Sequence, residues 1–320
     1  MRALISGAGG FVGRHLLAYL CQHMPHVALH GILFSDSGRR AALEALGCQV
    51  WTLDLRDADA VRDLVARVRP DRIYHLAGQA FVPRSFAAPW ETLEVNIRGT
   101  LNLLEAVRVL KLETRILVVS SAEIYGAADA DSLPLTESAP FMPSSPYSVS
   151  KIAQDMLAWQ YARAHSLHVV RARPFNHIGT GQSVDFAVPN WASQIAAAEL
   201  GLREPVVAVG NLAAARDFTD VRDVVRAYAL ALERGVAGAV YNVCSGVPQT
   251  MQHILETLIS LSRTPITVRV DPERFRPVEI PVLYGSYARL QADTNWRPEI
   301  DLVQSLTDVL NEWRARLRSA

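Results

Sequence analysis

At 320 residues, half of them hydrophobic, the chain can build a sizeable core, and this composition excludes a disordered protein. Lysine plus arginine equals aspartate plus glutamate at 32 each, so the bulk charge gives no reason to expect a nucleic acid or an anionic membrane as the partner. A small ligand is the better expectation.

Short apolar runs alternate with longer amphipathic segments in the first half of the chain. Strands are expected at ALIS, VALHGILF, VWTLD, RIYHLA and RILVVSS, and helices between them from Phe11 and near 38–46, 57–68 and 91–110. A helix that begins at SPYSVSK and a strand LHVVRARP that ends at Pro174 follow. This βαβα order predicts an α/β protein with a Rossmann-type, doubly wound parallel sheet.

Beyond Pro174 the regular alternation fails, and loop-rich stretches separate helices expected near 185–199, 220–234, 249–262 and 302–318. We therefore expect a smaller α/β lobe over the carboxyl edge of the sheet, where open α/β folds bind ligands. The expected dinucleotide-binding domain comprises 1–174 with returning segments at about 213–243 and 286–297. The expected substrate-binding lobe comprises 175–212, 244–285 and 298–320.

A glycine-rich turn, GAGGFVG at residues 7–13, lies directly between the first strand and the first helix. Gly7 permits the tight turn, Gly10 lets the backbone approach a pyrophosphate, and Gly13 allows close packing of helix on strand. The spacing is one residue longer than the common dinucleotide pattern. Because a strand precedes it and a helix follows it, a cofactor-binding turn is favoured over a merely glycine-rich one.

The end of the second expected strand bears on the choice between NADP and NAD. Ser35, with Arg39 and Arg40 beyond it, would suit a 2′-phosphate, although the arginines could equally be the solvated face of a helix. NADP is therefore only slightly favoured. Asp54, at the end of VWTLD, is expected at the adenine edge of the cofactor or, alternatively, as a helix N-cap.

Tyr147 and Lys151 stand four residues apart at the start of an expected helix, on one helical face. A nearby ammonium favours the phenolate, so Lys151 is expected to lower the phenol's pKa from its ordinary value near ~10. The alternative is an exposed pair without function. Ser121, at the carboxyl end of a central strand, lies where the sheet delivers ligands and could hydrogen-bond a carbonyl oxygen.

The cysteines and histidines give no sign of a metal. Cys21, Cys48 and Cys244 lack metal-site or redox spacing and are expected to be buried, reduced thiols. Among the histidines, His75 is expected in the core, whereas His177 either lines the pocket or packs. Without an apolar targeting segment or a run long enough to cross a bilayer, a cytoplasmic protein is expected.

Further motifs resemble those of the extended short-chain dehydrogenases/reductases that act on nucleotide sugars. The motifs are GAGGFVG, LDLRD, YHLAG, VNIRGT, VSSAEIYG, SPYSVSK and RPFNHIGTGQ. The second lobe is similar to the GDP-mannose-derived branch in VGNLAAARDFTDVRD, YNVCSG and FRPVEIPVLYGSYARLQADTNWRPEI. Within that branch the chain most resembles the GDP-6-deoxy-4-keto-mannose reductases, which form GDP-D-rhamnose, and it is related to the GDP-mannose 4,6-dehydratases.

The resemblance implies a role for particular residues. The implied catalytic residues are Ser121, Tyr147 and Lys151. The implied cofactor contacts, including those argued above, are Gly7, Gly10, Phe11, Val12, Gly13, Ser35, Asp54, Leu55, Leu76, Ala77 and Gly78, with Tyr147 and Lys151. The implied substrate contacts are Ser121, Glu123, Asn176, Arg216, Arg276 and Glu279. Guanidinium groups suit a nucleotide diphosphate because their rigid fork binds phosphate oxygens bidentately.

The expected reaction is NAD(P)H-dependent reduction of the C4 ketone of GDP-4-dehydro-6-deoxy-D-mannose, giving GDP-D-rhamnose or its C4 epimer GDP-6-deoxy-D-talose. A dehydratase needs a further acid and base, and Ala122, where dehydratases carry a hydroxyl or carboxyl group, has no proton to give. Glu123 keeps a carboxylate, so dehydration stays open. The alternatives are a dehydratase or epimerase with tightly bound cofactor, and a non-catalytic dinucleotide sensor. The resemblance also implies a homodimer formed through a four-helix bundle.

Overall fold

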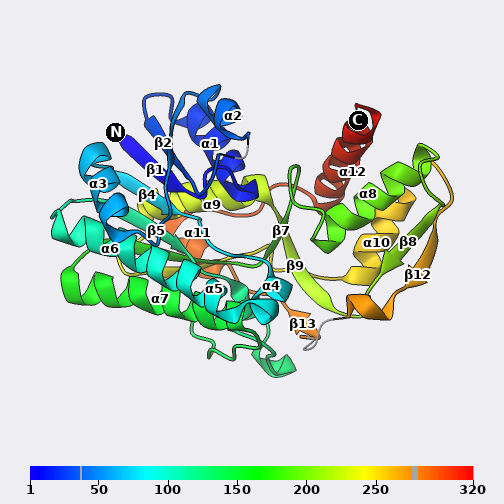
Figure 1. Ribbon diagram of the computed structural model, residues 1–320. Coiled ribbons are helices and arrows are strands. Elements are labelled where there is room, and N and C mark those ends of the chain that lie inside the picture. The colour runs from blue at the N-terminus through cyan, green and yellow to red at the C-terminus, as the bar shows by residue number, and fades with distance from the viewer. Residues whose placement is uncertain (37, 276–279, 320) are drawn as a thin grey trace.

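A seven-stranded sheet forms the centre of the computed structural model, which describes residues 1–36, 38–275 and 280–319. Its order is β10-β6-β5-β4-β1-β2-β3, and every neighbouring pair is parallel (Figure 1). The strands are β1 (Arg2–Ser6), β2 (Ala28–Leu33), β3 (Cys48–Thr52), β4 (Arg72–His75), β5 (Arg115–Val119), β6 (His168–Pro174) and β10 (Val240–Val243). The order reverses between β1 and β4, and this switch point is where a doubly wound sheet binds its ligand.

Alternation of apolar side chains along each strand divides the core into two layers. Leu4 and Ile73 belong to the buried cluster on one face, whereas Ile5 and Tyr74 belong to the cluster on the other. Successive strand residues point to opposite faces, so strands that are apolar at every position must be covered on both sides. The predicted doubly wound α/β fold is confirmed.

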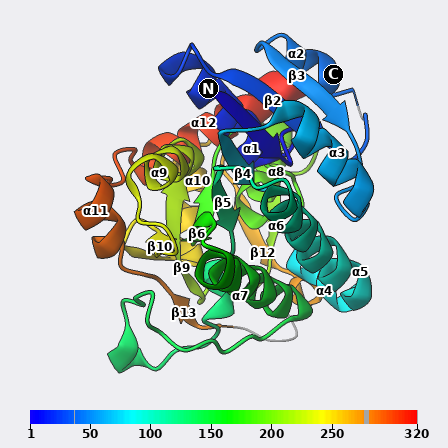
Figure 2. The same cartoon turned by 90° about the vertical axis from the view of Figure 1, so that its left-hand side faces the viewer.

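Helices cover both faces of this sheet. One face carries α3 (Ala58–Val68), α6 (Gly99–Val109) and α7 (Pro146–His165), which lie nearest the viewer in Figure 2, and the other carries α1 (Phe11–His23), α9 (Val221–Arg234) and α11 (Ala288–Thr294). The short helix α2 (Arg40–Glu44) follows β2, and α4 (Val82–Ala87) and α5 (Pro89–Leu93) follow β4. A π-helical turn at Glu94–Arg98 joins α5 to α6, so the helix predicted near 91–110 is interrupted.

The second lobe, at the right of Figure 1, has its own apolar core. It contains α8 (Ala187–Glu199), α10 (Met251–Ser260) and α12 (Leu302–Arg318), with the parallel pair β8 (Val206–Val209) and β12 (Thr267–Val270). Strand β9 (Ala215–Asp220) pairs with β7 (Asn176–Ile178), β11 (Pro248–Thr250) and β13 (Val282–Leu283). Of the segment expected to return to the Rossmann domain at about 213–243, α9 and β10 belong to the Rossmann portion, whereas β9 lies outside the main sheet. The predicted division into two domains stays a prediction.

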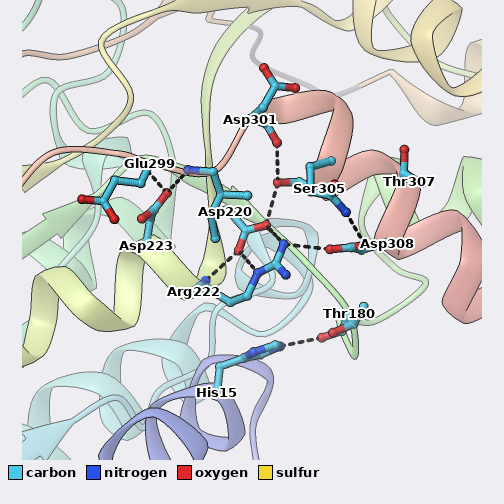
Figure 3. Close-up of polar contacts among 12 residues, drawn as sticks. His15, Thr180, Asp220, Arg222, Asp223, Glu299, Asp301, Ser305, Thr307 and Asp308 are labelled. Atoms are coloured by element: carbon cyan, nitrogen blue, oxygen red, sulfur yellow. Dashed lines mark hydrogen bonds and ion pairs between the residues drawn. The ribbon is translucent and has the colours of Figure 1, made fainter. Parts of the chain in front are cut away.

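A polar cluster ties the lobe to the Rossmann portion (Figure 3). Asp220 caps α9 and accepts hydrogen bonds from Ser305 on α12 at 2.6 Å and from Arg222, whose guanidinium also reaches Asp308 at 2.8 Å. Nearby, His15 of α1 contacts the carbonyl oxygen of Thr180 at 2.8 Å. These bonds connect α9 to α12 and α1 to the loop that follows β7, segments that are far apart in the sequence.

The sequence expectations need correction in three details. Cys21 is exposed on α1, whereas Cys48 and Cys244 are buried as expected. Helices α4 and α11 are not predicted, because each is too short to show a clear helical period. The N-cap of α3 is Asp57, which accepts from the amides of Asp59 and Ala60, so the cap position considered for Asp54 is wrong.

Candidate active site

A cleft of about 450 Å³ lies at the carboxyl edge of the main sheet, between the Rossmann portion and the lobe. The ends of β1, β4, β5 and β6 contribute to it, together with the beginnings of α1, α7 and α8. Of the residues predicted to bind or react, it brings together Gly7, Gly10, Phe11, Val12, Gly13, Leu76, Gly78, Ser121, Glu123, Tyr147, Lys151 and Asn176. Residues up to 169 positions apart in sequence therefore face one space at the switch point, since the chain returns to this edge after every helix.

The glycine turn has the tight geometry that its sequence predicts. Gly7 has a φ of +72°, and a Cβ built on it would lie 2.9 Å from the amide nitrogen of Ala77. A Cβ on Gly13 would lie 2.3 Å from the carbonyl oxygen of Gly7. Helix α1 then begins at Phe11 without a side-chain cap, so its first amide groups face the cleft as an anion-binding end.

Tyr147 and Lys151 are placed by the first turns of α7. Ser145 caps this helix through the Ser148 amide, and Pro146 occupies its first position. The two catalytic candidates are only 7% and 5% exposed, so the alternative of an exposed pair is wrong. The Lys151 ammonium lies 5.9 Å from the centre of the Tyr147 ring and donates to the carbonyl oxygen of Val119 at 3.0 Å.

Burial, and not the neighbouring ammonium, controls the pKa of the phenol. Desolvation raises the pKa of Tyr147 to about 12, opposed by a hydrogen bond with Ser121 and aided by the charge of Glu123. Desolvation also lowers the pKa of Lys151 to about 8. The expectation that Lys151 lowers the pKa of Tyr147 is therefore wrong for the ligand-free protein. Both side chains are buried, and desolvation outweighs any effect of the ammonium on the phenol. Tyr147 is a protonated donor at neutral pH.

A network of buried hydrogen bonds supports the start of α7 on the side that faces the sheet. His75 bonds Ser6 on β1 at 2.7 Å and Thr100 on α6 at 2.9 Å, and Gln154 of α7 donates to the same threonine hydroxyl. Burial lowers the pKa of His75 to about 3, so the imidazole stays neutral. The expectation of a satisfied core histidine is confirmed, and the network fixes α7 against the strand ends.

Asn96 makes a second supporting contact from within the π-helical turn. Its side chain accepts from the Gln79 amide at 2.7 Å and donates to the Ser150 hydroxyl at 2.8 Å. A Cβ built on Gly78 would lie 2.8 Å from the Asn96 amide oxygen and 3.6 Å from the Lys151 ammonium. Gly78 therefore permits the close approach of three elements beside the lysine.

Aromatic side chains line the cleft where the lobe faces the Rossmann portion, and the sequence patterns did not identify two of them, Phe81 and Phe186. The rings of Phe81, before α4, and Phe186, before α8, meet edge to face at 5.9 Å. His177 also lines the cleft, where its ring stacks on Phe11 at 6.0 Å and its Nδ1 contacts the Phe175 carbonyl oxygen at 3.0 Å. Single aromatic residues in loops carry no periodic signal, so only the fold reveals this pairing.

The remaining predicted residues lie around or outside the cleft. Ser35 is exposed beyond β2, Asp54 is held by Arg56 at 2.6 Å, and the carbonyl oxygen of Leu55 accepts from Asn102. Ala77 contacts the glycine turn rather than the cleft, and Arg216 is buried on β9 with its Nη1 bonded to the carbonyl oxygens of Ala215 and Ile280. Two predicted substrate contacts, Arg276 and Glu279, lie outside the described residues.

Arg39 lies close to the glycine turn, where sequence left its role open. A Cβ built on Gly9 would lie 3.3 Å from the Arg39 Cδ atom. The Arg39 guanidinium forms no ion pair within 1–36, 38–275 and 280–319, whereas Arg40 is engaged by Asp36, Glu44 and Thr52. The two arginines therefore differ, and only Arg39 presents an unpaired cation beside the turn.

The described part of the chain holds neither a candidate metal site nor a helix suited to a membrane. No group of three or more His, Cys, Asp or Glu side chains there could hold a metal ion. None of the helices in that part combines the length and the apolar character needed to cross a bilayer.

Comparison with known proteins agrees with this geometry. The chain is 39% identical over 318 residues to the GDP-6-deoxy-D-mannose reductase of Pseudomonas aeruginosa, an alignment that covers 99% of this chain and 98% of the relative. The structure of RMD from Pseudomonas aeruginosa complexed with NADPH superposes with a TM-score of 0.86 at 37% identity, covering 98% of this chain and 99% of that one. A UDP-glucose 4-epimerase from Thermus thermophilus in complex with NAD gives 0.87 at 28% identity, covering 98% and 99%. A family model described as GDP-mannose 4,6 dehydratase matches residues 4–309, and the chain belongs to this family.

Proposed function

We propose that the protein is an NAD(P)H-dependent reductase of the C4 ketone of GDP-4-dehydro-6-deoxy-D-mannose and forms GDP-D-rhamnose or its C4 epimer. The observation that carries this function is the convergence of Ser121, Tyr147 and Lys151 beside the glycine turn. The full-length similarity to a GDP-6-deoxy-D-mannose reductase supports the substrate class. Ala122, which has no ionisable group, favours reduction over dehydration.

The residues of the cleft can perform this reaction as follows. A reduced nicotinamide, when bound, supplies a hydride to C4 of the sugar. Ser121 and Tyr147 hydrogen-bond the ketone oxygen and hold the carbon in place for transfer. Tyr147 then gives its proton to that oxygen, so that the ketone becomes an alcohol, and the Lys151 ammonium stabilises the phenolate that remains. The sugar face that meets the hydride decides between the two epimers.

The glycine turn fits the pyrophosphate of a dinucleotide, since side chains at Gly7 or Gly13 would collide with backbone atoms and the end of α1 favours an anion. NADPH is favoured over NADH because Arg39 offers an unpaired guanidinium beside the turn within the described residues, close to Ser35 in sequence. Asp54, Leu55 and Ala77 remain proposed cofactor contacts near the adenine and the neighbouring strand end.

The lobe is proposed to hold the GDP-sugar. Asn176 and Glu123 line the cleft and are proposed to contact the hexose. Arg216 lies deeper, on β9, and is proposed with Arg276 and Glu279 as a contact to the nucleotide. In this reaction Glu123 has no proton-transfer step.

A homodimer and a cytoplasmic location are also proposed. The stripe Val149, Ile152, Met156 and Trp159 follows one face of α7 at helical spacing, and Val149 and Trp159 are each 46% exposed. Trp90 on neighbouring α5 is 75% exposed. Apolar side chains gathered on α5 and α7 favour a partner there. A second copy of α7 and of the helical segment 89–109, which includes α5 and α6, would complete a four-helix bundle.

The test incubates the protein with GDP-4-dehydro-6-deoxy-D-mannose and either NADPH or NADH, and follows both the absorbance of the reduced cofactor and the product by NMR. We expect one cofactor oxidised for each ketone reduced, with NADPH preferred. Tyr147→Phe should lower kcat about 100-fold or more, because the proton donor is lost. Tyr161→Phe, on the same helix but outside the cleft, serves as the matched control and should retain activity.

The alternatives give different results in the same assay. A dehydratase or epimerase would act on a GDP-hexose without net oxidation of added cofactor, and Glu123→Gln would abolish dehydration. A dinucleotide sensor would bind the cofactor without turnover. Absence of net cofactor oxidation would refute the reductase.

A further inference from the structure

Tyr228 on α9 has a hydroxyl group that the folded chain does not satisfy. The residue is completely buried, and it lines the cleft that holds Ser121 and Tyr147. Its hydroxyl oxygen has no hydrogen-bond partner among the residues that the structure describes. Buried polar groups are nearly always paired, and leaving one unpaired is unfavourable by about 1–3 kcal/mol. Because Tyr228 also lines the cleft, unlike Tyr74, whose buried hydroxyl is unpaired too among the described residues, a partner bound in the cleft is indicated.

The surroundings of Tyr228 indicate the chemistry of that partner. Phe11, Val12, Leu76 and Val119 line the same cleft and pack against the apolar cluster to which Tyr228 belongs. This wall lies on the α1 and α9 face of the sheet. A flat aromatic ring fits such a wall, whereas a diphosphate or a sugar, with many polar groups, would lose hydrogen bonds to water there.

The reacting groups approach from the other face. Tyr147 and Lys151 come from α7, which packs on the face opposite α9. The two phenols are nonetheless near enough for the charge of Tyr147 to raise the pKa of Tyr228, beyond the larger effect of burial. Tyr228 thus lies at the reacting end of the cleft, across from the proton donor.

We propose that the Tyr228 hydroxyl donates a hydrogen bond to the carboxamide oxygen of a bound nicotinamide. The inference rests on the proposed dinucleotide-dependent function and goes beyond it by assigning the group that orients the ring. The carboxamide is the one polar substituent of the ring, so a fixed donor on one side sets which ring face meets the sugar. Tyr228 is a positioning residue and takes no part in proton transfer.

The experiment compares NADPH with thionicotinamide-NADPH, in which sulfur, a weaker acceptor, replaces the carboxamide oxygen. Dissociation constants are measured by calorimetry in the absence of sugar, for the unaltered protein, Tyr228→Phe and Tyr74→Phe. Tyr74 is an equally buried tyrosine of the same apolar cluster that does not line the cleft, which makes it a matched control.

We expect the unaltered protein and Tyr74→Phe to bind NADPH about fivefold more tightly than the thio analogue, as a neutral hydrogen bond of about 1 kcal/mol implies. In Tyr228→Phe the preference should disappear, because neither cofactor then accepts the hydrogen bond whose strength distinguishes them. The ligand-free melting temperature of Tyr228→Phe should be equal or higher, since an unpaired buried hydroxyl is removed. Tyr228→Met provides the same comparison should the phenylalanine variant fold poorly.

Equal discrimination by the unaltered protein and both Tyr228 variants would overturn the inference and leave the proposed reductase intact. Conversely, a protein that binds NADPH with the Tyr228-dependent preference but never oxidises it with the keto sugar would refute the reductase and support the role of Tyr228. The two failures are thus distinct.

Discussion

Burial of Lys151 makes the charged form of its side chain less favourable. Desolvation lowers its pKa to about 8, and the ammonium is needed to stabilise the phenolate left when Tyr147 gives up its proton. The lysine is therefore mostly charged below about pH 8 and mostly neutral above it. We therefore expect kcat/KM for NADPH, measured from pH 6 to pH 10, to fall as pH rises through about 8.

Lys151→Arg is the matched variant for this profile. A guanidinium keeps its charge throughout that range, so whatever activity the variant retains should lose the fall near pH 8. A wild-type profile that stays flat from pH 7 to about pH 9.5 would contradict the assignment.

Single residues also mark the limit of sequence reasoning about the site. Gly7, Tyr147 and Lys151 were identifiable because their spacing within one turn or helix carries the signal. The direction of the Tyr147 pKa was not, because its burial comes from segments distant in sequence that close over α7. The place of Tyr228 in the cleft could not be predicted for the same reason, because a tyrosine on the apolar face of an amphipathic helix is typical of an ordinary core residue.

At the scale of elements, a buried ion cluster joins α7 to β6. Asp155 of α7 accepts from Arg171 at 2.7 Å and from Arg173 at 2.8 Å, and all three side chains are buried. Asp155→Asn would leave two buried guanidinium groups without a counter-charge. We expect a loss of about 3–5 kcal/mol in the free energy of unfolding, seen as a lower melting temperature.

The control for that substitution is an ion pair on the surface. Asp59→Asn breaks the exposed contact with Arg62 on α3 and should change stability by less than about 1 kcal/mol. Equal effects of the two substitutions would show that burial of the α7 cluster does not matter.

Elements of the Rossmann portion were predictable where a period of two or 3.6 extends over enough residues. Strand β6 ends at Pro174 as expected, and α3 matches the helix predicted near 57–68. The interruption at Glu94–Arg98 was not predictable, because the amphipathic pattern runs through it without a break. It arises where Asn96 is drawn to Gln79 and Ser150, contacts that only the assembled fold provides.

At the scale of the whole molecule, the exposed stripe on α7 makes the proposed dimer testable. Trp159→Glu places a charge in the middle of an apolar interface, so the variant should elute and scatter as a monomer while the unaltered protein is a dimer. Val303→Glu, at a similarly exposed valine on α12, should leave the dimer intact. A monomeric unaltered protein at micromolar concentration would refute the proposal.

The sequence predicts the main sheet in more detail than it predicts the second lobe. The sheet follows from local alternation, whereas the lobe is assembled from short strands whose pairing depends on partners far along the chain, such as β7 with β9 and β9 with β13. No local pattern in the sequence specifies those partners, so the course of the chain between the lobe and the sheet cannot be predicted from periodicity.

The position of β10 affects how this chain is made in the cell. In the part of the chain that the structure describes, the open side of β6 is covered by Val240–Val243, which the ribosome adds 66 residues after β6 ends at Pro174. Until then a nascent chain would hold six parallel strands with an uncovered border, and α9, which covers one face, is made only shortly before β10. The intervening lobe segments must emerge before the sheet can be finished, so the two parts mature together during translation instead of one after the other.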